Sequence, residues 1–265
     1  MTEPYPEVVA RFYDAVYAQV RDGVDNEWYL NRMAEADGPS LEIGVGTGRL
    51  FAEARRRGLD VRGIDLSPAM IERCRAKLAP DDRGRVWVAD AVSFRSDQPF
   101  ALVCAPFRVL SHVHDTGDQL RLLDAVHDCL RPGGSFVFDL YVPNLKLLLE
   151  GLPEHTDFDG EYAPGRRLRR LVTAGPADLA RQITPVHMTF AWDEEDGEHR
   201  GEWAFEMRFF FRFEIEHLVA RSTLALESIH GDFAGAALTA NSREYIVTCR
   251  RPAVSRSEQE YDTSC

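Results

Sequence analysis

A glycine-rich turn at residues 41–49 constrains the fold of this chain more than any other feature. A short apolar strand runs into three glycines at every second position, Gly44, Gly46 and Gly48, and a helical segment follows directly. Glycine tolerates positive φ and has no side chain, so such a turn is tight and lets a ligand approach the backbone closely. The helix that follows points its first amide groups at that ligand. The turn therefore predicts a strand-turn-helix unit with a binding site.

The glycine spacing separates the candidate ligands. A dinucleotide-binding turn needs G-x-G-x-x-G, but Arg49 stands at the third position and the third glycine, Gly48, comes one residue early. A phosphate-binding loop ends in Gly-Lys-Ser/Thr, whereas Arg49 and Leu50 follow here. Glu42 precedes the first glycine, and an acid suits a cationic group such as an ammonium better than a pyrophosphate.

Residues 40–140 alternate between strand and helix patterns, which predicts βαβ units and a parallel sheet. Ser67 is expected to cap a helix that has Pro68 at its first position. Ligands of such sheets bind outside the carboxyl ends of the strands. The expected strands are 41–43, 61–64, 85–89, 101–105 and 135–140, with helices over 50–57 and 118–130 and a break at Pro132-Gly133-Gly134.

The stretch from about 160 to 212 shows a different pattern. Apolar and polar residues alternate over 186–192 and again over 203–211, with a polar hairpin loop between them and a possible third strand at 168–173. We expect an antiparallel sheet, residues 151–212, inserted into a domain formed by 1–150 and 213–252. In this division, residues 1–39 form a helical cap. Residues 213–220 form a helix, residues 224–230 and 245–249 form strands, and 253–265 form a disordered tail.

Composition limits the partners. The net charge of −12 disfavours a phosphate backbone, so nucleic acid is not expected as a partner. Five cysteines without a C-x-x-C pair indicate free thiols in a reducing cytosol. With no signal-peptide pattern and no apolar stretch long enough to span a bilayer, we expect a cytoplasmic protein without membrane attachment. One basic cluster is interpreted as a solvated strand face: Arg166, Arg167, Arg169 and Arg170.

Acidic residues end the next two strands as well. Asp65 lies about 20 residues past the first glycine, where a carboxylate accepts hydrogen bonds from ribose hydroxyls. Asp90, followed by Ala91, can accept from an exocyclic amine. Together with Glu42, these acids imply a ligand with a ribose, an amino-bearing base and a cationic tail.

These motifs resemble, in order and spacing, the class I S-adenosylmethionine-dependent methyltransferases. The resemblance rests on Glu42-x-Gly44-x-Gly46-x-Gly48, on 63–67 and 89–91, and on Leu130-Arg131-Pro132-Gly133-Gly134. It implies a Rossmann-like seven-stranded sheet, S-adenosylmethionine as cofactor and S-adenosylhomocysteine as product. The glycine turn would hold the methionine part and Met70 would pack on the adenine. The cofactor-binding residues expected in full are Tyr17, Glu42, Gly44, Gly46, Gly48, Arg49, Asp65, Leu66, Met70, Asp90, Ala91 and Phe107.

Residues 138–144, the inserted sheet, 230–233 and Ser242-Arg243 resemble a subgroup that acts on small molecules. That subgroup includes sugar-amine N-methyltransferases, glycine N-methyltransferase and tailoring enzymes of natural-product pathways, and its inserted sheet helps to cover the substrate. The resemblance implies a small-molecule acceptor in secondary metabolism.

The segment after the fourth strand, residues 105–115, is expected to border the methyl group. Enzymes acting on DNA or glutamine carry Asn/Asp-Pro-Pro-aromatic there, and this chain has Ala105-Pro106-Phe107 instead. His112 is the candidate base, because its usual pKa suits proton removal at neutral pH, although a purely structural histidine stays open. Arg108 would hold an anionic group or pair on the surface. Tyr13 is the third candidate catalytic residue.

Several alternatives remain open. No third ligand accompanies His112-x-His114, so no metal is expected. An amine nitrogen is the favoured acceptor, with an oxygen or a carbon such as that of an indole as alternatives. A non-catalytic binder of the cofactor is a second class, and a nicotinamide oxidoreductase, which Arg49 disfavours, is a third. A pocket bordered by aromatic side chains, Trp192, Trp203 or Phe210, would favour an apolar or aromatic substrate. A homodimer is also considered.

Overall fold

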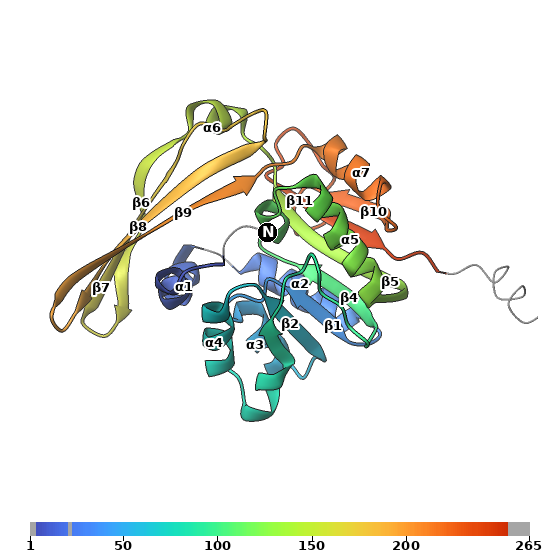
Figure 1. The fold of residues 1–265 in the computed structure, drawn as a ribbon, viewed down its shortest axis with the longest axis horizontal. Helices are drawn as coiled ribbons and strands as arrows, with labels where there is room; N and C mark the ends of the chain where they lie inside the picture. The colour runs from blue at the N-terminus through green and yellow to red at the C-terminus, as the bar shows by residue number, and fades with distance from the viewer. Residues whose placement is uncertain (1–3, 21–22, 254–265) are drawn as a thin grey trace, which may run out of the picture.

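The computed structural model describes residues 4–20 and 23–253, which contain two β-sheets (Figure 1). The larger sheet has seven strands in the order β10-β11-β5-β4-β1-β2-β3. The strand β11 runs antiparallel to β10 and β5, and all other neighbouring strands are parallel. This confirms the predicted Rossmann-like sheet. Its strands are β1 (Ser40–Ile43), β2 (Val61–Asp65), β3 (Val86–Val88), β4 (Phe100–Ala105), β5 (Leu130–Tyr141), β10 (Ala225–His230) and β11 (Glu244–Arg250).

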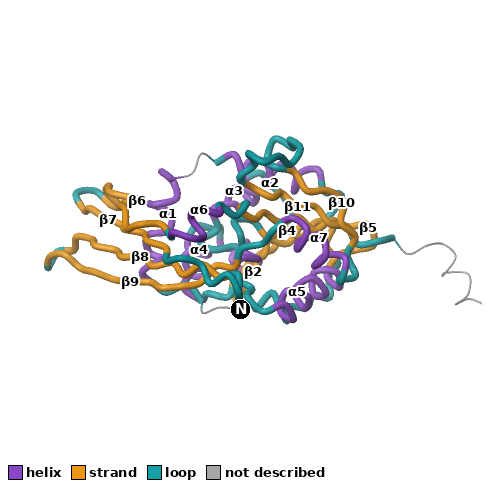
Figure 2. The backbone as a smooth tube through the Cα atoms, turned by 90° about the horizontal axis from the view of Figure 1, so that it is seen from above, coloured by secondary structure: helices purple, strands orange, loops and turns teal. Residues whose placement is uncertain are grey.

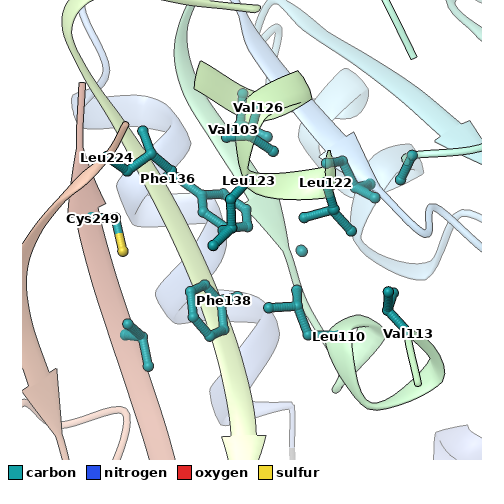
Figure 3. Packing of buried hydrophobic residues seen from close by; sticks show 14 of the residues in the cluster. Val103, Leu110, Val113, Leu122, Leu123, Val126, Phe136, Phe138, Leu224 and Cys249 are labelled. Atoms are coloured by element: carbon teal, nitrogen blue, oxygen red, sulfur yellow. The ribbon is translucent and has the colours of Figure 1, made fainter. Parts of the chain in front are cut away.

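Helices cover both faces of the large sheet. On one face, the apolar residues of α5 (Thr116–Cys129) pack on β4 and β5, and Figure 3 shows Leu122, Leu123 and Val126 near Phe136 and Phe138. All five side chains are buried, so this cluster fixes the position of the central strands. The other helices of this domain are α2 (Val24–Glu35), α3 (Arg49–Arg56), α4 (Pro68–Ala76) and α7 (Arg212–Ala220), with short 3₁₀ helices η1 (Pro80–Arg85) and η2 (Val109–His112).

The local helix signals are confirmed. The Ser67 side chain accepts a hydrogen bond from the Met70 amide at 3.4 Å, and Pro68 occupies the first turn of α4. The prediction that Pro132–Gly134 ends the preceding helix and separates it from the strand is wrong in detail. The helix α5 ends at Cys129 and β5 begins at Leu130, so the strand runs through Pro132 and both glycines.

The smaller sheet is the insertion, an antiparallel sheet of β6 (Leu152–Ala163), β7 (Arg166–Ala174), β8 (Ile183–Glu194) and β9 (Gly197–Arg208). A short helix, α6 (Leu145–Glu150), leads into it, and seen from above the sheet extends away from the large one (Figure 2). The sequence predicted β7, β8 and β9 but not β6, whose residues lack a clean alternation of apolar and polar side chains.

One basic residue of the insertion corrects a sequence interpretation. Arg170 is not on a solvated face: it is 2% exposed. Its Nε and Nη2 donate to the Asp157 carboxylate at 3.0 and 2.6 Å, and its guanidinium lies 5.1 Å from the centre of the Tyr17 ring. Arg167, in contrast, is exposed and pairs with Asp159.

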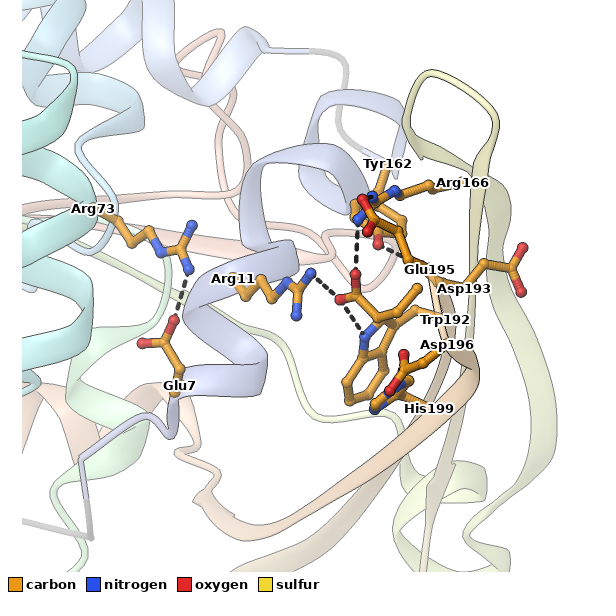
Figure 4. A network of polar contacts seen from close by, with 11 residues as sticks. Glu7, Arg11, Arg73, Tyr162, Arg166, Trp192, Asp193, Glu195, Asp196 and His199 are labelled. Atoms are coloured by element: carbon orange, nitrogen blue, oxygen red, sulfur yellow. Dashed lines mark hydrogen bonds and ion pairs between the residues drawn. The ribbon is translucent and has the colours of Figure 1, made fainter.

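The helix α1 (Glu7–Val20) lies between the insertion and the large domain. Its residues Val9, Phe12 and Val16 are buried against the insertion and against Met70 of α4. Polar contacts bind it on both sides, as Figure 4 shows: Glu7 pairs with Arg73 of α4 at 2.6 Å, and Arg11 pairs with Glu194 of β8. The helix therefore positions the insertion relative to the large sheet.

Two other expectations concern the chain as a whole. Cys74, Cys104, Cys129 and Cys249 are buried free thiols. The predicted disordered tail lies outside the described residues, apart from residue 253. In the described part of the chain, no helix is both long and apolar enough to cross a membrane.

Candidate active site

A cavity opens at the carboxyl ends of the parallel strands and encloses about 760 Å³, part of it open to solvent. Nine of the predicted site residues line it: Tyr13, Gly44, Gly46, Asp65, Leu66, Met70, Ala91, Phe107 and His112. Seven further residues complete the wall. Pro106 and Val109 belong to the segment expected to border the methyl group, and Ile64 and Ala89 belong to the motifs that carry the resemblance, whereas the sequence did not indicate Pro4, Tyr5 or Ile43.

The glycine turn forms the floor of this cavity. Gly44, Gly46 and Gly48 all have positive φ, of 73°, 55° and 81°. A Cβ on Gly44 would lie 2.4 Å from Val109 Cγ2 and one on Gly48 would lie 2.6 Å from Cys74 Sγ, whereas one on Gly46 would meet no atom nearer than 4.0 Å. Gly48 therefore serves the packing of α3 on α4, and Gly46 leaves its backbone open to a ligand.

Asp65 lies at the end of β2 with its carboxylate on the cavity wall. Its two oxygens accept hydrogen bonds from the Gly46 and Ser67 amides, each at 2.8 Å. Burial raises the pKa of Asp65 and these two amides oppose the shift. Because the two carboxylate oxygens together have four lone pairs, the carboxylate can still accept from a ligand.

The other two predicted acids do not reach the cavity wall. Asp90 accepts a hydrogen bond from the Val92 amide at 2.9 Å and so closes the turn after β3, while its neighbours Ala89 and Ala91 line the cavity. Glu42 is 2% exposed, and burial raises its pKa well above the usual range, although the Arg49 charge opposes this. Its Oε2 has no hydrogen-bond partner among the described atoms.

Arg49 and Tyr17 lie behind the wall. The Arg49 guanidinium donates to the buried Asp25 carboxylate at 3.0 Å and lies 5.3 Å from the centre of the Phe107 ring. The Tyr17 ring packs edge-on against Phe107, with centroids 5.2 Å apart, and on Tyr13 at 4.4 Å. Both residues therefore support Phe107, and only Phe107 and Tyr13 reach the cavity.

The loop after β4 is held in a strained conformation. Phe107 and Arg108 have φ of 62° and 63°, which costs a non-glycine residue about 1–3 kcal/mol. The Phe107 amide donates to the buried Asp139 carboxylate at 2.7 Å, and the Tyr29 hydroxyl donates to the same oxygen at 2.8 Å. Burial raises the pKa of Asp139 to about 6, against the effect of these two donors. The strain fixes the Phe107 ring on the cavity wall.

Arg108, predicted to bind an anionic group, lies beside the cavity and does not line it. Its Nη2 donates to Glu244 at 3.1 Å and its guanidinium lies 5.3 Å from the centre of the Tyr141 ring.

His112 lines the cavity at the end of η2. Its Nε2 is 3.1 Å from the Tyr5 hydroxyl, and its ring stacks on Phe205 of β9 with centroids 5.9 Å apart. Burial lowers the pKa of His112 to about 4, so the imidazole is neutral at pH 7. Its role as a base stays a prediction.

The insertion contributes to this side of the site through Phe205 and Trp203. Of the three aromatics that were considered for a pocket, Trp203 contacts Tyr5, at 4.4 Å between centroids. Trp192 packs on Phe12, and Phe210 is buried in the main core. Nothing in the sequence marked Tyr5, because a single aromatic before a helix carries no periodic signal. Within the described residues, no cluster of three or more His, Cys, Asp or Glu is arranged to hold a metal ion.

Comparison with known proteins identifies the domain. Residues 41–134 match the family described as "Methyltransferase domain". The chain carries a methyltransferase domain of the class that its motifs resemble. S-adenosylmethionine is the cofactor of this class, and the cavity is compatible with it, because Gly46 leaves space for a ligand and the Asp65 carboxylate faces that space.

A curated relative of the methyltransferase domain is a magnesium-protoporphyrin O-methyltransferase of Rhodobacter capsulatus. It is 41% identical over 46 residues, which cover 17% of this chain and 20% of that protein. The match thus spans a fifth of the length of that relative.

Solved structures share the fold of nearly the whole chain. The CcbJ methyltransferase from Streptomyces caelestis has a TM-score of 0.76 at 23% identity, covering 94% of this chain and 100% of that one. The sugar N-methyltransferase KedS8 from Streptoalloteichus has a TM-score of 0.73 at 20% sequence identity, and the match covers 95% of this chain and 97% of that one. CalS10 is an amino pentose methyltransferase from Micromonospora echinaspora, solved with bound S-adenosylmethionine. Its TM-score is 0.68 at 19% sequence identity, and the match covers 95% of this chain and 99% of that one.

Proposed function

We propose that this protein transfers the methyl group of S-adenosylmethionine to an amine nitrogen of a small molecule. The proposal rests on the chemistry of the cavity wall. Its titratable side chains, among the residues described, are Tyr5, Tyr13, Asp65 and His112, and Asp65 belongs to the cofactor side. Burial lowers the pKa of His112 to about 4, so its imidazole is a weak base, and burial raises the pKa of Tyr5, so its phenol stays protonated at neutral pH. A neutral amine attacks through its own lone pair and needs no base beforehand, whereas an alcohol or phenol does.

The residues of the wall then have separate tasks. Asp65 would accept hydrogen bonds from the ribose, and the apolar side chains of Leu66, Met70, Ala89 and Ala91 would enclose the base. When bound, S-adenosylmethionine supplies a sulfonium methyl group, which is a strong electrophile. The protein's contribution is alignment and exclusion of water.

The aromatic side of the cavity would align the acceptor and exclude water. Tyr5, Tyr13, Phe107 and His112 are large and cover the acceptor side, and they favour an acceptor with an apolar or aromatic part.

The structural neighbours support the acceptor atom and the metabolic setting. One is named a sugar N-methyltransferase, and another an amino pentose methyltransferase involved in calicheamicin biosynthesis. We therefore place the proposed reaction in secondary metabolism. The cytoplasmic location and the homodimer stay predictions.

Two measurements test the proposal. Isothermal titration should give a dissociation constant for S-adenosylhomocysteine in the micromolar range or below, and absence of binding would refute the proposal entirely. Transfer of labelled methyl groups should then be compared for matched acceptors, benzylamine against benzyl alcohol and glucosamine against glucose, with phenol and indole included. We expect label in the N-methyl products identified by mass spectrometry; label only in methyl ethers or in methylindole would replace the amine as acceptor.

A further inference from the structure

Tyr5 connects three parts of the molecule at the mouth of the cavity. Its hydroxyl is 3.1 Å from His112 Nε2, and its ring lies 4.4 Å from the ring of Trp203 on β9. Its carbonyl accepts a hydrogen bond from the Ser67 hydroxyl at 2.8 Å, next to the Asp65 carboxylate that binds the Ser67 amide. The phenol is thus fixed in position on the cavity wall by η2, β9 and the start of α4.

The direction of the hydrogen bond between Tyr5 and His112 decides what the phenol offers to the cavity. The contact itself fits either direction, depending on the His112 tautomer. A phenol O–H is the stronger donor of the pair and a neutral imidazole nitrogen is a good acceptor, so we assign the tautomer in which the Tyr5 hydroxyl donates to His112 Nε2. With its proton committed to His112, the Tyr5 oxygen keeps its lone pairs as acceptors. His112 and Tyr5 line the same cavity, so these lone pairs are available to a bound ligand.

We propose that Tyr5 orients the acceptor amine by accepting a hydrogen bond from its N–H group, while His112 holds the Tyr5 proton away from the cavity. The inference rests on the proposed amine methylation. An N–H group bound to Tyr5 leaves the nitrogen lone pair free to face the methyl group, which is the alignment that in-line transfer requires. The acceptor class is therefore a primary or secondary amine. A tertiary amine has no N–H group and should not be methylated further.

The test uses ligands of the cofactor site, so it does not depend on knowing the acceptor. Sinefungin has an amine-bearing carbon in place of the sulfonium sulfur, so its amine lies where S-adenosylmethionine has its methyl group, and S-adenosylhomocysteine has no group there. In Tyr5→Phe, which keeps the ring, the dissociation constant for sinefungin should rise about tenfold or more, while that for S-adenosylhomocysteine changes less than about threefold. The control is Tyr162→Phe, whose hydroxyl donates to the Asp193 carbonyl at 2.6 Å on the insertion; it should change neither constant.

A second variant tests the direction of the hydrogen bond. In His112→Phe, the Tyr5 proton is free to turn into the cavity, so sinefungin should again weaken selectively. Equal weakening of both ligands by Tyr5→Phe would mean that Tyr5 only closes the cavity, and an unchanged sinefungin constant in either variant would also overturn the inference. Failure of the unaltered protein to bind S-adenosylhomocysteine would instead refute the proposed function itself.

Discussion

The two walls of the cavity are built in different ways. The cofactor wall comes from residues 43–91, where the ends of β1, β2 and β3 present glycines, short apolar side chains and one carboxylate. The acceptor wall is made of aromatic rings from distant segments: Tyr5 and Tyr13 near the N-terminus, and Phe107 and His112 after β4. The first wall follows from the sheet itself, whereas the second is complete only when the N-terminal segment with Tyr5 and Tyr13 docks.

This difference predicts that a substitution at one wall changes the stability or the ligand affinity of that wall and leaves the other wall unaffected. The docking of the insertion depends on the apolar packing around Phe12 and on charged side chains such as Arg170. Substitutions there should weaken the docking of the insertion and leave cofactor affinity unchanged. Substitutions at Asp65 should weaken cofactor binding and leave the docking unchanged.

The largest effect is expected for Arg170→Met. The variant leaves the Asp157 carboxylate partly buried without its partner, which should lower the free energy of unfolding by about 3 kcal/mol in urea titrations. Affinity for S-adenosylhomocysteine should stay within about threefold. The exposed pair offers the control: Arg167→Met should cost less than about 1 kcal/mol. Loss of cofactor binding in Arg170→Met would show that the walls are not independent.

Asp139 gives the sheet side its own pH dependence. Its folded pKa of about 6 exceeds the ordinary value of 3.8, so the folded protein binds this proton more tightly than the unfolded chain. Stability from this group is therefore lost as pH rises from about 4 to 6, by about 3 kcal/mol. Asp139→Asn keeps an oxygen for the Phe107 amide and the Tyr29 hydroxyl. Measured by urea titration, the free energy of unfolding of Asp139→Asn should rise by this amount relative to that of the unaltered protein between pH 4 and pH 7. A difference between the two proteins that does not change with pH would contradict the prediction.

His112 gives the acceptor side the opposite dependence. Its folded pKa of about 4 is below the ordinary 6.5, so the folded protein binds the proton less tightly and this group adds stability as pH rises from about 4 to 6.5. The contribution is about 3 kcal/mol and nearly cancels that of Asp139. In His112→Phe, the free energy of unfolding should lack this increase between pH 4 and pH 6.5, as measured by the same titrations. A similar slope in both proteins would place His112 in solvent.

The smallest effect concerns two acids, Asp65 at the end of β2 and Asp90 after β3. Asp65→Ala removes a ribose acceptor and the partner of the Gly46 amide, so affinity for S-adenosylhomocysteine should fall by ten- to a hundredfold, about 1.4–2.7 kcal/mol. Asp90→Ala should change it by less than about threefold, since that carboxylate only closes a turn. Calorimetry would measure both, and equal losses would restore Asp90 to the cofactor site.

The sequence predicted most of the residues that line the cavity at the ends of β1 and β2, because the signals there are local. Positive φ at Gly44 and Gly46, the Ser67 cap and the carboxylate of Asp65 each depend on neighbours in the chain or on one strand end. The same signals did not distinguish wall from support. Arg49 and Tyr17 have plausible side chains at plausible positions, but their contacts with Asp25 and Phe107 come from other elements.

By itself, the sequence determined the parallel sheet, the glycine turn and the class of cofactor, because hydrophobic period and glycine spacing are set by backbone geometry over a few residues. Tertiary structure decided which aromatic side chains meet at the acceptor side. Tyr5 reaches His112 across more than a hundred residues. It also decided that Arg170 is buried and that His112 is neutral, since burial and desolvation depend on what packs around a side chain, and the chain order does not contain that.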